Sequence, residues 1–235
     1  MDKPCSEPFL SIVIPVWNDF SAVNLLLQDL IDLDALILEI ILVDGGKDER
    51  LEDLASAFTK VTLTRTLPQR AGQMNWGAEQ ASGRVLWFLH ADTRLTSDVS
   101  NDLILFVQQS SKSWGRFDVR LDQASGLLKV VEWMMNRRSA LTGIATGDQG
   151  MFVYRDVFEQ VGRFPSQALM EDIELSKRLK LVSKPYLPNS KLVTSSRKWL
   201  REGGLRTVVK MWYLRFIYWR GASAQEVHDI YYRQK

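Results

Sequence analysis

Three polar clusters follow strand-like apolar segments in the first half of the chain, and their residue types suit ligand binding. One spans residues 15–19, the second begins at Asp44, before two glycines, and the third spans 90–94 and contains Asp92. In an open α/β sheet, ligands bind outside the carboxyl ends of the strands. Each aspartate alone could instead be a helix N-cap or a turn residue. Two such carboxylates at strand ends of one sheet favour a shared binding site.

A dense group of carboxylates lies further along, at Glu171, Asp172 and Glu174. Their negative charges repel one another, which is unfavourable unless some of them bind or react. The structural alternative is a helix N-terminus, where the helix dipole offsets part of the repulsion. The chemical alternative is general base catalysis, since a carboxylate with an ordinary pKa is ionised at pH 7.

Alternating strand-like and helix-like segments would position these groups. In the first half, strands are expected at 10–15, 40–43, 61–66 and 85–89, and helices at 19–33, 51–58 and 71–81, the last closed by Ser82-Gly83. This alternation with short links predicts βαβ units, a mostly parallel sheet and helices on both faces. In the less regular second half, helices are predicted at 97–109, 127–140, 170–182 and 205–218, and strands at 115–121 and 150–154.

Composition excludes several classes of protein. The 235 residues are 46% hydrophobic and 25% charged, which is typical of a globular chain. A net charge of +2 is too small for a general nucleic-acid binder. A single cysteine, Cys5, and two histidines exclude an internal disulfide, a cysteine zinc site and a histidine-rich metal cluster. Because residues 1–8 are polar and no apolar run approaches the roughly 20 residues that span a bilayer, we expect a soluble protein of a reducing cytoplasm.

Three familiar motifs are absent. The chain has no G-x-G of a dinucleotide fingerprint and no G-x-S-x-G nucleophile elbow. Gly72 and Gly77 have the spacing of a P-loop, but Ala78-Glu79 follows where Lys and Ser or Thr are required. A nicotinamide-dependent dehydrogenase, a P-loop NTPase and an α/β-hydrolase therefore lack their defining residues here.

The C-terminal part of the chain is basic and aromatic. Residues 191–235 hold ten basic and three acidic residues, whereas residues 1–190 hold 20 and 25. Aromatic residues lie among those charges, at Trp199, Trp212, Tyr213, Phe216, Tyr218, Trp219, Tyr231 and Tyr232. Such interleaving suits an anionic membrane surface. The structural alternative is a helix that packs its rings on the domain and leaves its charges in water.

Six motifs occur in order: SIVIPVWND, ILVDGG, RAGQMNWGAEQASG, LWFLHADTRL, GDQG and LMEDIELSKRL. Together they resemble family 2 glycosyltransferases of the GT-A fold. Within that family they are most similar to the bacterial "glycosyltransferase 2-like" subgroup that reads FLHADTRLP, TGIATGDQ and MEDIELS. The resemblance implies a GT-A domain over 1–200, with a nucleotide-binding half at about 9–95 and an acceptor half at 96–200. A basic, aromatic, helical extension would follow over 201–235.

The resemblance also implies the reaction. Such an enzyme moves a sugar from a nucleoside-diphosphate sugar to a hydroxyl acceptor, with inversion at the anomeric carbon. A UDP-sugar is the default donor, and GDP- or dTDP-sugars stay open. A lipid-linked acceptor and peripheral membrane contact through 204–221, on the inner face of the membrane, are further hypotheses. The rival functions are a sugar nucleotidyltransferase and a non-catalytic nucleotide-sugar-binding module.

By the same resemblance, the donor nucleotide contacts the backbone at Pro15 and Val16 and the carboxylate of Asp44. Arg70 would approach the nucleotide or its diphosphate. It lies at a predicted helix start, where backbone N–H groups add to an anion site. The alternatives are a turn stabilised by Asp44 and a solvated arginine at position 70.

Asp92 corresponds to the last carboxylate of the family's D-x-D motif, which ligates Mg²⁺ or Mn²⁺ on the diphosphate. His90 stands where the first aspartate often stands, so this sequence departs from the common pattern. One carboxylate completed by water and phosphate oxygens is still an acceptable Mg²⁺ site. His90 could bond the sugar or ribose, or be a structural residue at a strand end.

The resemblance assigns the general base to Asp172, with Glu171 as the second candidate. Asp148 and Gln149 could bond sugar hydroxyls, although a tight turn explains the flanking glycines equally well. The SSRKW stretch loosely resembles the family's Q-x-x-R-W motif. From it we expect a cationic and aromatic contact to the diphosphate or acceptor, with candidates Arg197, Lys198 and Trp199.

Overall fold

The computed structural model describes residues 7–109, 111–123, 126–196 and 204–232. Its central element is a six-stranded sheet in the order β3-β2-β1-β4-β7-β5. The strands of this sheet are β1 (Leu10–Val16), β2 (Ile37–Asp44), β3 (Val61–Arg65), β4 (Val85–Phe88), β5 (Trp114–Gly115) and β7 (Phe152–Tyr154). The first four are mutually parallel, whereas β7 runs antiparallel to β4 and to β5.

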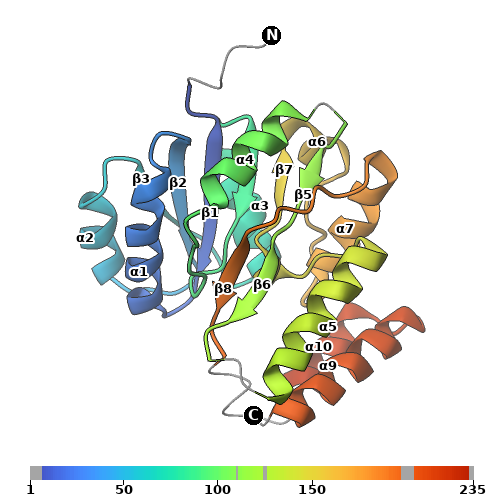
Figure 1. Cartoon of the computed structure of the whole chain (residues 1–235). Helices are drawn as coiled ribbons and strands as arrows, with labels where there is room; N and C mark the ends of the chain where they lie inside the picture. The colour runs from blue at the N-terminus through green and yellow to red at the C-terminus, as the bar shows by residue number, and fades with distance from the viewer. Residues whose placement is uncertain (1–6, 110, 124–125, 197–203, 233–235) are drawn as a thin grey trace.

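Helices cover both faces of this sheet (Figure 1). One face buries the apolar sides of α1 (Phe20–Leu30), α2 (Arg50–Ser56) and α4 (Val99–Gln108). The other buries α3 (Arg70–Gln80), α6 (Arg155–Gln160) and α7 (Glu171–Val182). β1 shows why two layers form, because Ile12 and Ile14 point into the first core and Val13 into the second. The predicted mostly parallel α/β sheet with helices on both faces is confirmed.

Gly77 sets how closely α3 lies on the sheet. A Cβ atom there would come within 2.4 Å of Val13 Cγ1 and 2.9 Å of Val43 Cγ2. Only glycine therefore allows this helix to approach β1 and β2 so closely. The approach brings Arg70, at the first turn of α3, to the edge where the parallel strands end.

The second half differs from the sequence prediction in several places. Residues 115–121, predicted as one strand, are two strands in two sheets: β5, and β6 (Asp118–Leu121), which pairs in parallel with β8 (Lys191–Thr194). The backbone changes partners between them, because Arg116 N–H donates to Tyr186 and Phe117 N–H donates to Gln149. β8 and α6 were not predicted, since their short segments carry no clear periodicity.

The sequence predicted that Ser82-Gly83 caps α3, but the structure does not show this. The helix ends at Gln80, and its C-cap residue Ala81 has an extended backbone. Gly83 is required for close packing instead, because a Cβ there would lie 2.5 Å from Ser11 Oγ.

The remaining helices form a separate layer beside the sheet (Figure 1). They are α5 (Leu127–Thr142), α9 (Gly204–Trp219) and α10 (Ala224–Tyr232). The predicted C-terminal helix is thus present, followed by a second helix that was not predicted. Leu214 and Val227 pack with Met170 and Ile173 in a small third core, so these helices join the start of α7. In the described part of the chain, no helix is long and apolar enough to cross a membrane.

Candidate active site

Three parallel strands end along one edge of the sheet, and the first polar cluster lies there. In register, Val16 of β1 pairs with Asp44 of β2, which pairs with Arg65 of β3. The Asp44 side chain is fully buried, and its Oδ1 accepts a 2.7 Å hydrogen bond from Gly46 N–H. Its Oδ2 has no hydrogen-bond donor, and Arg65 Nε lies 3.7 Å away. Asp44 therefore keeps acceptor capacity that a ligand could use.

The β1 end is held by hydrogen bonds within the protein. The Val16 carbonyl accepts from Gly45 N–H and from Gln73 Nε2 of α3. The same Gln73 nitrogen donates to the Val43 carbonyl, 2.8 Å away, so one buried amide ties two strand ends together. Sequence reasoning missed Gln73, because a polar residue inside a helix gives no local sign of its distant partners. Pro15 is half-buried at this edge.

A cavity of about 510 Å³ lies between the loop after β4, the end of β8 and the helices α3, α5, α7, α9 and α10. Pro15, Val16 and Asp44 are not among the residues that line it. Its lining includes most of the predicted polar residues together with a wall of helical side chains. The lining residues are Arg70, His90, Asp92, Val131, Met134, Met135, Arg138, Thr146, Gly147, Asp148, Leu169, Met170, Glu171, Asp172, Ile173, Thr194, Ser195, Thr207, Val208, Met211, Trp212, Arg215 and Tyr231.

Glu171 and Asp172 form the acidic side of the cavity, in the first turn of α7. Glu171 Oε1 accepts a 2.7 Å hydrogen bond from Arg70 Nε. Asp172 Oδ2 accepts from Gly147 N–H at 2.8 Å and lies 3.9 Å from Arg70 Nη2. Asp172 Oδ1 accepts a 2.8 Å hydrogen bond from Ile173 N–H. Glu171 therefore holds Arg70, while backbone N–H groups hold the Asp172 carboxylate at the cavity wall.

The electrostatics of this group follow from burial and proximity. Burial raises the pKa of Glu171, and Arg70 offsets only part of that effect. Burial by itself would lower the pKa of Arg70, but Glu171 and Asp172 raise it overall. Arg70 is thus a permanent cation at the cavity, positioned by the carboxylates that the sequence had grouped.

Met170 fixes the direction in which α7 begins. It is a non-glycine residue with a positive φ of 66°, and its side chain is buried. This left-handed conformation is unfavourable for most side chains and persists only where the surroundings hold it. Here it turns the chain into the helix so that the two residues that follow it line the cavity.

His90 and Asp92 lie on the loop after β4. Burial, and then Arg70, lower the pKa of His90 to about 3, so its imidazole is neutral at pH 7. A Cβ at Gly147 would lie 2.6 Å from His90 Nε2, so Gly147 allows the two loops to touch. Asp92 is half-buried and lines the cavity.

Divalent-metal binding would depend on Asp92. No group of three or more metal-binding side chains occurs in the part of the chain that the structure describes. A single carboxylate beside a cavity suits Mg²⁺ or Mn²⁺ when phosphate oxygens and water supply the other ligands. The donor set therefore fits a metal that arrives with a phosphorylated ligand.

Two predicted residues in the turn after α5 have different surroundings. Asp148 is half-buried, lines the cavity and makes no hydrogen bond or ion pair within the described ranges. Gln149 is fully buried, and its Oε1 accepts from Thr146 N–H while the Thr146 side chain accepts from Gln149 N–H, which forms a capping box. Gln149 shapes the turn and is not part of the cavity lining. Arg197, Lys198 and Trp199 lie outside the described residues.

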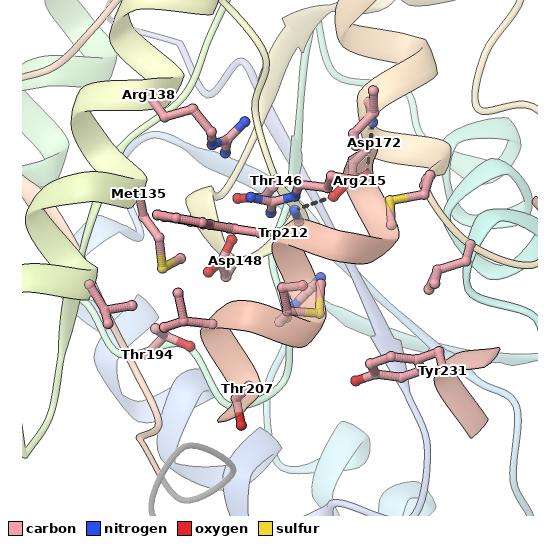
Figure 2. A pocket seen from close by; sticks show the side chains of 18 of the residues that line it. Met135, Arg138, Thr146, Asp148, Asp172, Thr194, Thr207, Trp212, Arg215 and Tyr231 are labelled. Carbon is pink, nitrogen blue, oxygen red and sulfur yellow. Dashed lines mark hydrogen bonds between the residues drawn. The ribbon is translucent and has the colours of Figure 1, made fainter. Parts of the chain in front are cut away.

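The helical wall was not predicted as part of the site. Figure 2 shows Arg138 and Met135 extending from α5, and Trp212 from α9, into the same space as Asp148 and Asp172. The basic and aromatic composition of residues 191–235 was the available signal. It suited either a membrane surface or packing on the domain, and part of this stretch lines the cavity.

Comparisons with known proteins complete the description of the site. Residues 11–158 match a family described as "Glycosyl transferase family 2". Two proteins named "Beta-monoglucosyldiacylglycerol synthase", from Trichormus variabilis and Nostoc sp., are each 22% identical over 232 residues, covering 89% of this chain and 48% of the relative. "Glycosyltransferase AglE" from Haloferax volcanii is 26% identical over 192 residues, covering 73% of this chain and 61% of the relative. The chain thus spans about half the length of the first two relatives.

Solved structures show the same fold. Residues 1–349 of S. aureus TarS superpose with a TM-score of 0.63 at 16% identity, over 83% of this chain and 62% of the other. The mannosyltransferase PcManGT from Pyrobaculum calidifontis, solved with GDP-Man and Mn²⁺, superposes with a TM-score of 0.62 at 17% identity, over 81% and 57%. At these identities the likeness establishes a GT-A-like fold and nothing finer.

Proposed function

The chain belongs to glycosyl transferase family 2, and from this premise we propose that it transfers a sugar from a nucleoside-diphosphate sugar to a hydroxyl acceptor, with inversion at the anomeric carbon. The observation that carries the proposal is that Asp92, Asp172 and Arg70 line one and the same cavity. This arrangement would let a metal at Asp92, a base at Asp172 and the cation Arg70 act on the same bound donor and acceptor.

The donor nucleotide would lie along the strand ends. We propose that the backbone at Pro15 and Val16 and Oδ2 of Asp44, which has no hydrogen-bond donor, hold the base and ribose. A UDP-sugar is the first donor to test. GDP-sugars come second, because a structural neighbour was solved with GDP-Man, and dTDP-sugars third. In this proposal, residues 9–95 form the nucleotide half, residues 96–200 the acceptor half, and the 201–235 extension adds to the cavity wall.

Asp92 would hold Mg²⁺ or Mn²⁺ against the donor diphosphate, and His90 would bond the sugar or ribose. The metal, when bound, supplies a Lewis acid that stabilises the negative charge of the departing nucleoside diphosphate. Arg70 supplies a second positive charge at the same cavity, and its ion pair with Glu171 sets its direction. Glu171 is a positioning residue in this scheme.

Asp172 is the proposed general base. Its carboxylate takes the proton of the acceptor hydroxyl as that oxygen forms a bond to C1 of the sugar. The bond from C1 to the diphosphate oxygen breaks in the same displacement, and its electron pair leaves with the nucleoside diphosphate. Asp148, which makes no hydrogen bond or close ion pair within the described chain, would accept hydrogen bonds from sugar hydroxyls.

A lipid acceptor is proposed from the exposed face of the helical layer. Val209, Phe216 and Trp219 of α9 are more than half exposed, as is Trp133 of α5. An apolar and basic helix face of this kind suits the interface of an anionic membrane. The names of two relatives state a glucosylated diacylglycerol, which agrees with this proposal. The protein would then work on the cytoplasmic face of a membrane.

A thermal-shift panel of UDP, GDP, dTDP, CDP and ADP, each with and without Mn²⁺, tests the proposal. A ligand that binds the folded state raises the melting temperature. We expect one nucleotide to raise it, more strongly with Mn²⁺, and the Asp92→Asn variant to lose the metal-dependent part. No shift at millimolar nucleotide would overturn the proposal in favour of a binding module for another ligand. Release of pyrophosphate during turnover would instead support a sugar nucleotidyltransferase.

A further inference from the structure

Two arginines on the helical wall of the cavity have no role in the reaction described above. Arg138 lies on α5 and Arg215 on α9, and both line the cavity. Nε and Nη2 of Arg138 and Nε of Arg215 are buried without any hydrogen-bond acceptor. Within the described ranges, neither guanidinium makes an ion pair with a carboxylate within 4.0 Å. The Nη1 of Arg138 has one long contact, 3.4 Å to the Ile144 carbonyl.

This arrangement is unfavourable unless an anion completes it. Burial and the neighbouring charge of Arg215 lower the pKa of Arg138 to about 10, although the negative charges of Asp148 and Asp172 act in the opposite direction. Arg138 still carries a full charge at pH 7. Buried N–H groups without acceptors lose the hydrogen bonds that they would make with water. Two such cations facing one cavity are typical of a site for a phosphate group, which accepts several charge-assisted hydrogen bonds.

The helical wall around the two arginines is largely apolar, although Asp148 and Asp172 line the same cavity and raise the pKa of Arg138. On α5, Val131, Met134 and Met135 line the cavity, and on α9 Val208, Met211 and Trp212 do so. Trp212 is 52% exposed, so the apolar wall continues to the surface of the molecule. The occupant should therefore combine an anionic group with a hydrocarbon part, which can leave the cavity along α9.

We propose that Arg138 and Arg215 bind the phosphate group of an amphiphilic acceptor, whose hydrocarbon part lies on the methionines and Trp212. This inference rests on the proposed function and makes it more specific, because it names a phosphorylated lipid as the acceptor class. The donor diphosphate has Arg70 and the metal at Asp92, so it does not require these two arginines. The acceptor's hydroxyl would reach Asp172 in the same cavity (Figure 2).

Binding of farnesyl phosphate, farnesol and inorganic phosphate to the full chain tests the inference, with UDP or GDP as a separate arm. The two farnesyl compounds differ only in the phosphate group. We expect farnesyl phosphate to bind at least about tenfold more tightly than farnesol or phosphate alone. Arg215→Gln and Arg138→Gln should each remove most of that difference and leave nucleotide affinity unchanged. Arg137→Gln, an exposed neighbour on α5, is the matched control.

Each other result contradicts the inference in a recognisable way. Equal affinity for farnesyl phosphate and farnesol would overturn it while nucleotide binding keeps the proposed function intact. A loss of nucleotide affinity in Arg215→Gln would assign the arginines to the donor diphosphate. A fall in melting temperature of both glutamine variants without ligand, together with unchanged binding in Arg138→Lys and Arg215→Lys, would assign them a structural role. We expect no such fall, because the variants remove buried charges that lack partners.

Discussion

The strand ends around Asp44 and the helical wall around Arg215 differ in how their polar groups are satisfied. At the strand ends, backbone and glutamine hydrogen bonds tie β1 and β2 together, and Asp44 Oδ2 has no hydrogen-bond donor but lies 3.7 Å from Arg65 Nε. On the helical wall, Arg138 and Arg215 leave three buried nitrogens without acceptors. In the first region, one carboxylate oxygen is left for a ligand. The second needs a charged ligand to become favourable.

This difference indicates that the two regions bind different substrates, one the donor and the other the acceptor. A rigid strand-end site suits a donor whose nucleotide part is constant, since pre-organised contacts lose little entropy on binding. A cavity between helices from distant parts of the chain can be reshaped with little effect on the sheet. Selection of the acceptor would therefore reside in α5, α9 and α10, and donor recognition in β1 and β2.

The largest expected effect is a loss of turnover, without a loss of nucleotide binding, when the proposed base in the cavity is changed. Asp172→Asn should lower turnover by at least about a hundredfold, because a general base typically contributes that much or more. Nucleotide affinity, measured by calorimetry, should stay the same, since the strand ends are untouched. Glu174→Gln is the matched control, because Glu174 lies in the same helical turn but does not line the cavity. If Asp148→Asn abolished turnover and Asp172→Asn did not, Asp148 would be the base.

A smaller effect is expected at the strand ends. Asp44→Asn keeps an oxygen for Gly46 N–H but removes the charge that would strengthen hydrogen bonds from a nucleotide. We expect about tenfold weaker nucleotide binding, with turnover at saturating donor nearly unchanged. Asp53→Asn, exposed on α2, controls for the loss of one negative charge. Unchanged affinity would mean that Asp44 only stabilises the turn, and the contrast between the two regions would fail.

The smallest effect concerns the surface beyond the cavity. Phe216 and Trp219 of α9 are 56% and 76% exposed, with ring centroids 6.2 Å apart. Changing both to alanine should weaken binding to vesicles rich in phosphatidylglycerol several-fold, because the rings would no longer enter the interface. Leu67→Ala, an 81% exposed residue in the nucleotide half, should change nothing. If the wild-type protein fails to sediment with anionic vesicles at low salt, the membrane proposal is wrong.

The parallel half of the fold could be predicted because its signals are local. The run from Val85 to Leu89 is apolar throughout, as a strand covered on both faces must be, and β4 forms there. The second half could not be predicted so well. Residues 115–121 change sheets at Arg116, and that change depends on which strands lie opposite rather than on the segment's own pattern.

The sequence by itself determined the family, the parallel sheet and the residues at its strand ends, because ordered motifs and hydrophobic periodicity are properties of neighbouring residues. It also grouped Glu171 with Asp172, but it could not show that Arg70 would pair with Glu171, which gives the two carboxylates different proposed roles. Only the tertiary structure brought α9 against α5 and placed Arg138 beside Arg215. Contacts between residues so far apart in the chain depend on how whole helices pack, and no local pattern encodes that packing.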